Sequence, residues 1–458
     1  MTGHIYIGLD FGMALTKVAV WAKQPQERTA TRFVVEFPRD NDPLNPADKN
    51  RALHLPSALW VGHGRIHGIP APGTRTLTRI DGIKKLMLAE WSGTPSPVPA
   101  STLGGLCAAN AEDWSYEKLA ILKLAFVLCD VDSRVFAYLS AAHPGARWMT
   151  LINAAVPPEQ GEFTSTSERT HRMRSVVERA WKLAGLFPRT DAGLPLNEAL
   201  RLVNSVYNEP LLQATKTPID VIPEALAAAC FQVTSDTATA GNWLTVDVGA
   251  LTTDISYFFF NPGREYRVAC YSSLQSNQVG MDSLAGRSTI IEVKGRPYLP
   301  HEALAKDPGL AIGHGEFNRV QDGISQAIRS GLRAAMIHQG STVAALVQNQ
   351  APRWRVLLVG GGSTHPAIAP TIRNWRFEGI GPVGMATCDP ASLPRDVLVL
   401  GVRERPQFHT IDPADQAILT IAVGLAQRRI DLPKWRRDDP EPRFAPKEPP
   451  ENALVGHN

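Results

Sequence analysis

Two segments of the chain carry an aspartate and a glycine two residues apart, with a further charged residue at the segment's end. They run from Asp10 to Lys17 and from Asp247 to Asp254. A glycine such as Gly12 in a tight turn lets backbone N–H groups approach phosphate oxygens. An aspartate beside phosphate is repelled, so its useful role is to hold Mg²⁺ through water, while a lysine can neutralise the phosphates. Each segment predicts a Mg²⁺-phosphate site, although a plain β-hairpin turn would use the same glycine.

The second segment adds two hydroxyl groups, and a third segment adds a run of glycines. Thr252 or Thr253 is suited to bonding a terminal phosphate oxygen or to positioning an attacking water. Farther along, the apolar stretch Val356–Val359 leads directly into three glycines and a serine, Gly360–Ser363. Glycines between a strand and a helix start allow very close approach of the backbone to a ligand. Ser363 is also suited to capping the helix that follows.

Strands and helices must position these segments, and the apolar patterns predict where they lie. We expect strands at 5–9, 18–21, 55–61, 149–156, 243–246, 255–258 and 355–359, and helices at 116–129, 171–186 and 417–428. A strand, an Asp-x-Gly turn and a second strand occur twice, which is a weak internal repeat. The sequence therefore predicts an α/β protein in which two related lobes face one another.

Length and composition favour a protein of several globular units inside the cell. The chain has 458 residues, of which 44% are hydrophobic and 20% charged. A net charge of +3 does not imply a nucleic-acid partner. Five scattered cysteines, no signal peptide and no apolar run of membrane-spanning length predict a cytoplasmic protein without a membrane association. Proline and charge dominate from about Pro433, so 433–458 is expected to be a disordered tail.

The order of the three segments resembles a single superfamily of nucleotide-binding proteins. It includes actin, the bacterial actin-like proteins, sugar kinases and the nucleotide-binding domain of the seventy-kilodalton heat-shock chaperones. Asp10–Lys17 is similar to its first phosphate motif, Asp247–Asp254 to its second and Val356–Pro366 to its adenosine motif. Ile222–Ala229 and Ile421–Ala426 are similar to its two connecting helices. Shorter collinear matches favour the chaperone-like and bacterial actin-like ATPases.

The resemblance implies a two-lobed actin-like ATPase fold, in which each lobe is an RNase H-like mixed sheet flanked by helices. Lobe I would span 1–221, with an outer subdomain at about 31–150, and lobe II would span 222–432. ATP or ADP would bind with Mg²⁺ between the lobes, and Asp10 and Asp247 would hold the metal through water. The catalytic residues would be Asp10, Glu224, Asp247 and Asp254, with Glu224 facing the attacking water. The nucleotide would lie against Gly12, Met13, Ala14, Lys17, Gly249, Ala250, Leu251, Thr252, Gly280, Gly360, Gly361, Gly362 and Ser363.

Several positions depart from the family's pattern. Met13 and Ala14 stand where the chaperones carry threonines, and two larger residues replace the usual glycines of the second phosphate motif. No lysine lies near Pro72, where the resemblance places the chaperones' catalytic lysine. Lys17 instead matches a lysine typical of actin and its bacterial relatives. These departures favour ATP binding over fast hydrolysis.

We expect a chaperone-like ATPase without a peptide-binding domain, because only about 30 residues follow Arg428. Such a protein would act as a nucleotide-dependent conformational switch for unidentified partner proteins. A self-assembling, filament-forming bacterial actin-like protein, for example in DNA segregation, is the alternative that Lys17 favours. A catalytically weak pseudo-ATPase also stays open, and a small-molecule kinase has the least support. The sequence assigns no role to an apparent insertion at about 187–220.

Overall fold

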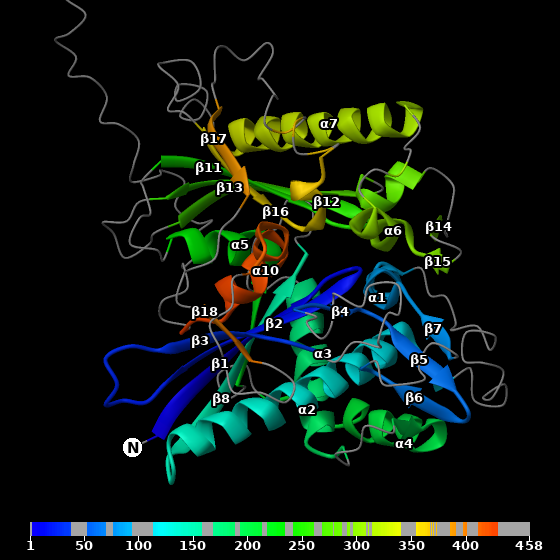
Figure 1. The fold of residues 1–458 in the computed structure, drawn as a ribbon, viewed down its shortest axis with the longest axis vertical. Helices are drawn as coiled ribbons and strands as arrows, with labels where there is room; N and C mark the ends of the chain where they lie inside the picture. Colours follow the sequence, from blue (N-terminus) through cyan, green and yellow to red (C-terminus); the bar gives the residue numbers. More distant parts are fainter. Residues whose placement is uncertain are drawn as a thin grey trace, which may run out of the picture.

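The structure is a computed structural model, and Figure 1 shows its fold. It describes residues 2–37, 53–69, 77–93, 113–157, 168–187, 193–212, 218–233, 241–260, 268–277, 279–285, 291–293, 296–307, 310, 314–339, 354–366, 368, 370, 372, 385–390, 397–400 and 411–428. The chain is a mixed α/β protein, as the sequence predicts, and it contains two large mixed sheets.

The first sheet has seven strands in the order β10-β8-β1-β2-β3-β18, with β4 paired to β2 off this path. They are β1 (Thr2–Phe11), β2 (Leu15–Lys23), β3 (Thr31–Val35), β4 (Leu55–Pro56), β8 (Arg147–Val156), β10 (Ile219–Pro223) and β18 (Val397–Leu400). β1 and β3 run antiparallel to β2, while β8 is parallel to β1 and β10 is parallel to β8.

The second sheet has five strands in the order β13-β12-β11-β16-β17. They are β11 (Gly241–Val248), β12 (Thr252–Phe260), β13 (Val268–Asn277), β16 (Trp354–Val359) and β17 (Met385–Pro390). β12 is antiparallel to both β11 and β13, and β16 is parallel to β11 and to β17. The first five strands of the first sheet follow the same succession of pairings, so the internal repeat extends well beyond the two Asp-x-Gly turns.

Successive residues of the central strands pack into different cores, because side chains alternate between the two faces of a sheet. In β1, Ile5 and Ile7 belong to the core beneath the first sheet, whereas Tyr6 packs on the opposite side with Ala422. In β11, Leu244 and Val246 enter one core of the second sheet and Trp243 enters another. Both faces of each sheet are therefore covered, which explains why the strand sequences are almost continuously apolar.

Four helices and a small sheet accompany the first large sheet. α2 (Tyr116–Ala142) packs against α1 (Ile83–Trp91), α3 (Glu168–Ala184) and α4 (Leu196–Tyr207). The Ser115 side chain caps α2 by accepting a hydrogen bond from the Lys118 N–H at 3.2 Å. The small sheet has the order β7-β5-β6-β9, with strands β5 (Leu59–Gly62), β6 (Arg65–His67), β7 (Thr78–Ile80) and β9 (Leu194–Pro195).

The second large sheet carries the long helix α7 (His314–Gln339), which lies across its outer side in Figure 1. The Tyr257 hydroxyl of β12 donates a hydrogen bond to the Ile328 carbonyl of α7 at 2.6 Å. Other short elements described in this half are α6 (Pro300–Lys306), the hairpin β14 (Ile291–Val293) and β15 (Arg296–Tyr298), and the 3₁₀ turns η3 (Met281–Ala285) and η4 (Gly361–Thr364).

Two helices, α5 (Glu224–Val233) and α10 (Pro413–Leu425), pack against each other between the two large sheets (Figure 1). α10 is bonded to both sheets. The Gly360 N–H, just after β16, donates to the Ala417 carbonyl at 3.1 Å. At the other end, Asn153 Nδ2 of β8 donates to the Leu425 carbonyl at 2.7 Å. A Cβ on Gly8 of β1 would lie 2.2 Å from the Ala422 carbonyl oxygen, so only glycine allows this packing.

Some sequence predictions need correction. The single extended stretch predicted at 55–61 is two strands in different sheets, because Ser57 is held between them. The Ser57 N–H donates to the Ala14 carbonyl at 2.7 Å, and its hydroxyl contacts the Thr16 hydroxyl at 2.8 Å. The helix predicted at 116–129 extends to Ala142, and the one predicted to end at Arg428 ends at Leu425.

Other predictions concern segments or boundaries that the structure describes only in part or not at all. The expected tail, 433–458, lies outside the described residues, and the lobe boundaries stay predictions. The apparent insertion at 187–220 contributes β9 and α4. Within the part of the chain that the structure describes, no helix has the length and apolarity needed to cross a membrane.

Candidate functional site

The two Asp-x-Gly turns lie at equivalent places in the two large sheets. The first hairpin is β1, the turn 12–14 and β2, and the second hairpin is β11, the turn 249–251 and β12. The Gly12 N–H donates to the Leu15 carbonyl at 3.0 Å, and the Gly249 N–H donates to the Thr252 carbonyl at 2.9 Å. The sequence repeat is thus a structural repeat in which the same backbone bond closes both turns.

Strand register brings one charged pair together in each hairpin. Asp10 lies opposite Lys17 in the first hairpin, and Asp247 lies opposite Asp254 in the second. Lys17 Nζ donates a hydrogen bond to Asp10 Oδ2 at 2.5 Å. The equivalent pair in the second hairpin consists of two carboxylates, so it has no cation of its own.

A second lysine reaches this region from outside the hairpins. Lys84, in the first turn of α1, forms an ion pair with Glu224, the first residue of α5, and the two side chains are 1% and 9% exposed. The sequence prediction missed Lys84 because it looked for a lysine near Pro72, and residues 70–76 lie outside the described chain. The sequence signal was weak, since it shows only that Lys84 directly follows the apolar residue at the start of a helix, and the structure adds that the side chain is buried.

We refer to these six groups together as the charged cluster: Asp10, Lys17, Lys84, Glu224, Asp247 and Asp254. Electrostatic interactions connect the two hairpins and the start of α5, because Lys17 interacts with Asp10, Asp247 and Glu224. Asp254 in turn interacts with Glu224, Asp247 and Lys84. The structure therefore brings all four predicted catalytic carboxylates to one place.

Burial and mutual repulsion raise the pKa of two of these carboxyl groups. The pKa of Asp247 rises to about 7, first because of burial and then because Glu224 and Asp10 oppose its charge, with Lys17 and Lys84 acting in the opposite direction. Burial is also the main reason that the pKa of Asp254 lies well above its usual value, followed by repulsion from Glu224 and Asp247. For Lys17, burial disfavours the ammonium, but attraction to Asp10 outweighs it and raises the pKa.

The cluster offers carboxylate oxygens and negative charge to a divalent cation held through water. It holds four carboxylates and two lysines, which leaves two excess negative charges when every group is ionised. Asp254 is 5% exposed, and its Oδ1 accepts no hydrogen bond from any residue that the structure describes. Its Oδ2 accepts one from the Thr252 hydroxyl at 3.3 Å. Oxygen ligands and uncompensated negative charge are what Mg²⁺ requires in a protein.

The described residues contain no group of three or more His, Cys, Asp or Glu side chains arranged to hold a metal directly. Holding Mg²⁺ through water, as predicted for Asp10 and Asp247, is a different arrangement and stays a prediction.

The turns themselves leave backbone N–H groups for a ligand. Within the described chain, the N–H groups of Met13 and Ala14 form no backbone hydrogen bond, nor do those of Ala250 and Leu251. The carbonyls are used instead, because Ala14 accepts from Ser57, while Gly249 and Ala250 accept from the first two residues of η3. Turn N–H groups without a backbone partner are the kind of donor that can bind an anion.

Gly280 supports the second turn by close packing. A Cβ at this position would lie 2.5 Å from the Ala250 carbonyl oxygen, so the residue must be glycine for η3 to reach the turn. This packing accounts for the glycine that the sequence prediction placed against the nucleotide.

The glycine triplet lies directly against the second hairpin. Gly360 has φ 79°, and a Cβ on it would lie 2.1 Å from Asp247 Oδ1. Gly362 is equally close to β11, since its Cβ would lie 2.4 Å from Val248 Cγ1. Gly361 has nothing nearer than 3.8 Å. The Ser363 hydroxyl is buried and donates to the Gly360 carbonyl at 2.7 Å, so it closes the turn.

We predict that Gly360→Ala lowers the free energy of unfolding by about 1–3 kcal/mol, because the positive φ becomes strained and the new methyl group displaces Asp247. Gly361→Ala is the matched control, since its Cβ meets no close neighbour. Urea denaturation of both variants checks the prediction. Equal stability of the two variants would contradict it.

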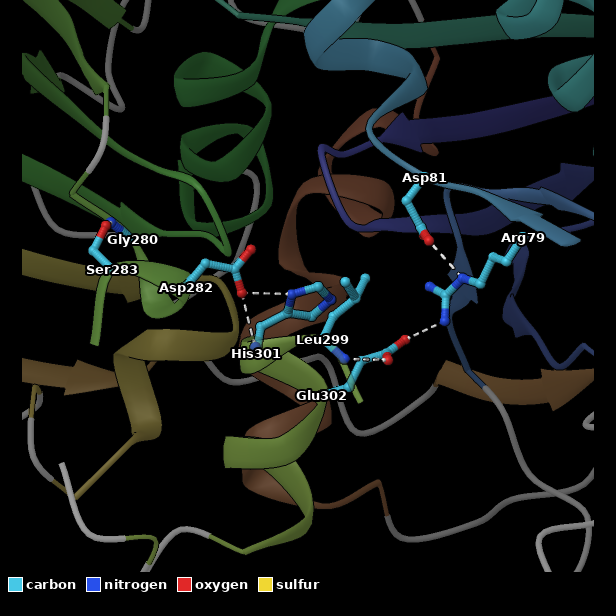
Figure 2. A network of polar contacts seen from close by, with 8 residues as sticks. All are labelled: Arg79, Asp81, Gly280, Asp282, Ser283, Leu299, His301 and Glu302. Atoms are coloured by element: carbon cyan, nitrogen blue, oxygen red, sulfur yellow. Dashed lines mark hydrogen bonds and ion pairs between the residues drawn. The ribbon is translucent and has the colours of Figure 1, made fainter. Parts of the chain in front are cut away.

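A polar network extends from the second turn toward the first half of the chain (Figure 2). Asp282 donates its N–H to the Ala250 carbonyl at 2.7 Å, and its Oδ1 lies 2.8 Å from both the backbone N and the Nδ1 of His301. The next residue, Glu302, accepts a hydrogen bond from Arg79 Nη1 of β7 at 2.8 Å. Arg79 also pairs with Asp81 at 2.9 Å.

The same network reaches the segment that carries Lys84. Asp81 comes three residues before Lys84, and Glu302 also caps α6 by accepting from the Leu299 N–H at 3.2 Å. The network thus links the turn after β11 to the segment that carries Lys84 into the charged cluster.

Comparison with known proteins adds no relative. No protein-family model matches the chain, and no curated protein matches it. The assignment of function therefore depends on the geometry of the chain itself.

Proposed function

We propose that this protein binds ATP with Mg²⁺ between two actin-like lobes and hydrolyses it slowly. The observation that carries the proposal is the pair of equivalent hairpins, which face one another with Asp10 and Asp247 at the same register position. Each hairpin also offers turn N–H groups that form no backbone hydrogen bond among the described residues. Two aspartates and two phosphate-facing turns are the elements that the resemblance predicts for a Mg·ATP site.

The sheet topology supports the two-lobed fold. Strands β3-β2-β1-β8-β10 and β13-β12-β11-β16-β17 share one succession of antiparallel and parallel pairings, which suits an RNase H-like sheet in each lobe. α5 and α10 lie between the sheets, where the connecting helices of an actin-like fold belong.

Different residues of the chain would hold the metal, the phosphates and the attacking water. Bound Mg²⁺ would neutralise phosphate charge. Asp10 and Asp247 would hold its water shell, and Lys17 would attract phosphate oxygens. Glu224 would orient the attacking water, and its buried pair with Lys84 keeps the carboxylate at one position. Phosphoryl transfer depends mainly on such positioning and charge neutralisation.

Slow turnover is favoured by the side chains at the two turns. Met13, Ala14, Ala250 and Leu251 carry no hydroxyl that could bond a phosphate oxygen. A protein that binds ATP and barely hydrolyses it is therefore the second candidate. In both cases nucleotide state would change the angle between the lobes, and an unidentified partner protein would respond to that angle.

The experiment is calorimetric titration of ATP and ADP with Mg²⁺ into wild-type protein and Asp10→Ala, followed by phosphate release on the same samples. We expect wild-type binding, and binding weakened at least about tenfold in Asp10→Ala, because the metal loses one of its two carboxylates. Asp322→Ala, at an exposed aspartate of α7, is the control and should bind normally. Absence of ATP binding by the wild type would reject the proposal.

A further inference from the structure

Lys17 occupies the place beside Asp10 where a metal ion would exert its charge. The two residues face each other across β1 and β2, and the side chains are 11% and 2% exposed. Their contact of 2.5 Å leaves no room for a cation between them. In the structure the negative charge of Asp10 is therefore already balanced from within the chain.

The second hairpin has no lysine at the equivalent position. Asp254 stands at the position equivalent to Lys17, and the facing Asp247 has its pKa raised to about 7. The four carboxylates of the charged cluster thus differ in their availability. A metal approaching without nucleotide finds Asp10 and Glu224 each paired with a lysine.

The ammonium of Lys17 also lies against the turn that would hold phosphate. A Cβ placed on Gly12 would be 3.2 Å from Lys17 Nζ, so the ammonium sits directly over this glycine. Phosphate oxygens arriving at the Met13 and Ala14 N–H groups would reach the same ammonium. A small movement of the Lys17 side chain, from Asp10 to phosphate, would then release the carboxylate.

We propose that Lys17 is an internal counter-ion that keeps Mg²⁺ away from Asp10 until the phosphates of a nucleotide draw its ammonium aside. The inference rests on the proposed ATP site and states the order in which nucleotide and metal bind there. Metal alone binds weakly, and nucleotide binding creates the metal position. Lys17 thereby prevents free divalent cations from occupying the site before the nucleotide binds.

Mn²⁺ is titrated into the protein without nucleotide, and its binding is measured from the electron paramagnetic resonance signal of free Mn²⁺. This measurement tests the order of binding and does not depend on activity. Lys17→Met should bind Mn²⁺ about 5- to 150-fold more tightly than the wild type, the usual range for coupling between two sites. Lys17→Arg, which keeps the charge, should behave as the wild type. Lys23→Met, at the far end of the same strand, is the matched control and should show no gain.

The position of the gained metal is tested by Asp10→Asn. In the wild-type background this change should not tighten the binding of Mn²⁺ alone, because the ammonium of Lys17 stays in place and is no longer balanced by Asp10. In the Lys17→Met background it should remove the gain. Unchanged Mn²⁺ affinity in Lys17→Met overturns the inference, and so does a gain in Lys17→Met that persists in the Lys17→Met/Asp10→Asn double variant.

If Lys17→Met does not fold, Lys17→Gln tests the same gain, since it removes the charge and keeps a hydrogen-bond donor beside Asp10. Failure of the wild type to bind Mg·ATP rejects the proposed function. Normal Mg·ATP binding together with either contrary Mn²⁺ result rejects only the inference about Lys17.

Discussion

Asp247→Asn is expected to make the nucleotide-free protein more stable at and above pH 7, and to abolish Mg²⁺-dependent nucleotide binding. The pKa of Asp247 is raised to about 7 in the folded protein, mainly by burial, whereas an unfolded chain has the ordinary value near 4. The folded state thus holds this proton more tightly than the unfolded state does. Asparagine stays neutral and avoids the repulsion.

The sign and range of the pH effect follow from that difference. The contribution of Asp247 to stability is complete below about pH 4 and declines as pH rises toward about 7, where the folded carboxyl ionises. Wild-type protein should lose about 2–4 kcal/mol of unfolding free energy across this window, the lower figure allowing for solvent at the partly exposed side chain. Asp247→Asn should lose much less.

Urea denaturation at several pH values between about 4 and 8 measures both proteins, with Asp322→Asn as an exposed control on α7. Adding Mg·ATP should raise the stability of the wild type and of the control, and leave Asp247→Asn unchanged. A variant that is less stable than wild type at pH 8 would show that Asp247 is not strained by its neighbours.

Lys84→Met is expected to destabilise the protein by about 3–5 kcal/mol, because it leaves the Glu224 carboxylate buried without its partner. The double variant Lys84→Met/Glu224→Gln should recover most of this loss, since no unpaired charge remains. Lys85→Met changes the neighbouring, exposed lysine and should have little effect.

Urea denaturation of the three variants gives the unfolding free energies. Phosphate release distinguishes stability from chemistry, because the double variant should fold well and still lose hydrolysis, having lost the carboxylate that orients water. A small effect of Lys84→Met, equal to that of Lys85→Met, would mean that the Lys84–Glu224 pair is not buried in solution.

Much of the local structure was predictable from the sequence. The strands around Asp10 and Asp247 follow from short apolar runs that end in an Asp-x-Gly turn, and the structure has them at β1, β2, β11 and β12. Such patterns depend on neighbouring residues, so they can be read from the chain directly. The stretch 55–61 was predicted incorrectly because its break depends on the bond between Ser57 and the distant turn at Ala14.

The sequence by itself thus determined the turns, their glycines and the positions of Asp10 and Asp247 within them, because φ preferences and strand periodicity are local properties. Only the tertiary structure decided which charges meet. Lys84 reaches Glu224 across 140 residues. Burial, followed by repulsion from Glu224 and Asp10, raises the pKa of Asp247 to about 7. Burial and charge interactions depend on distance in space, which the packing of α1 and α5 around the hairpins establishes.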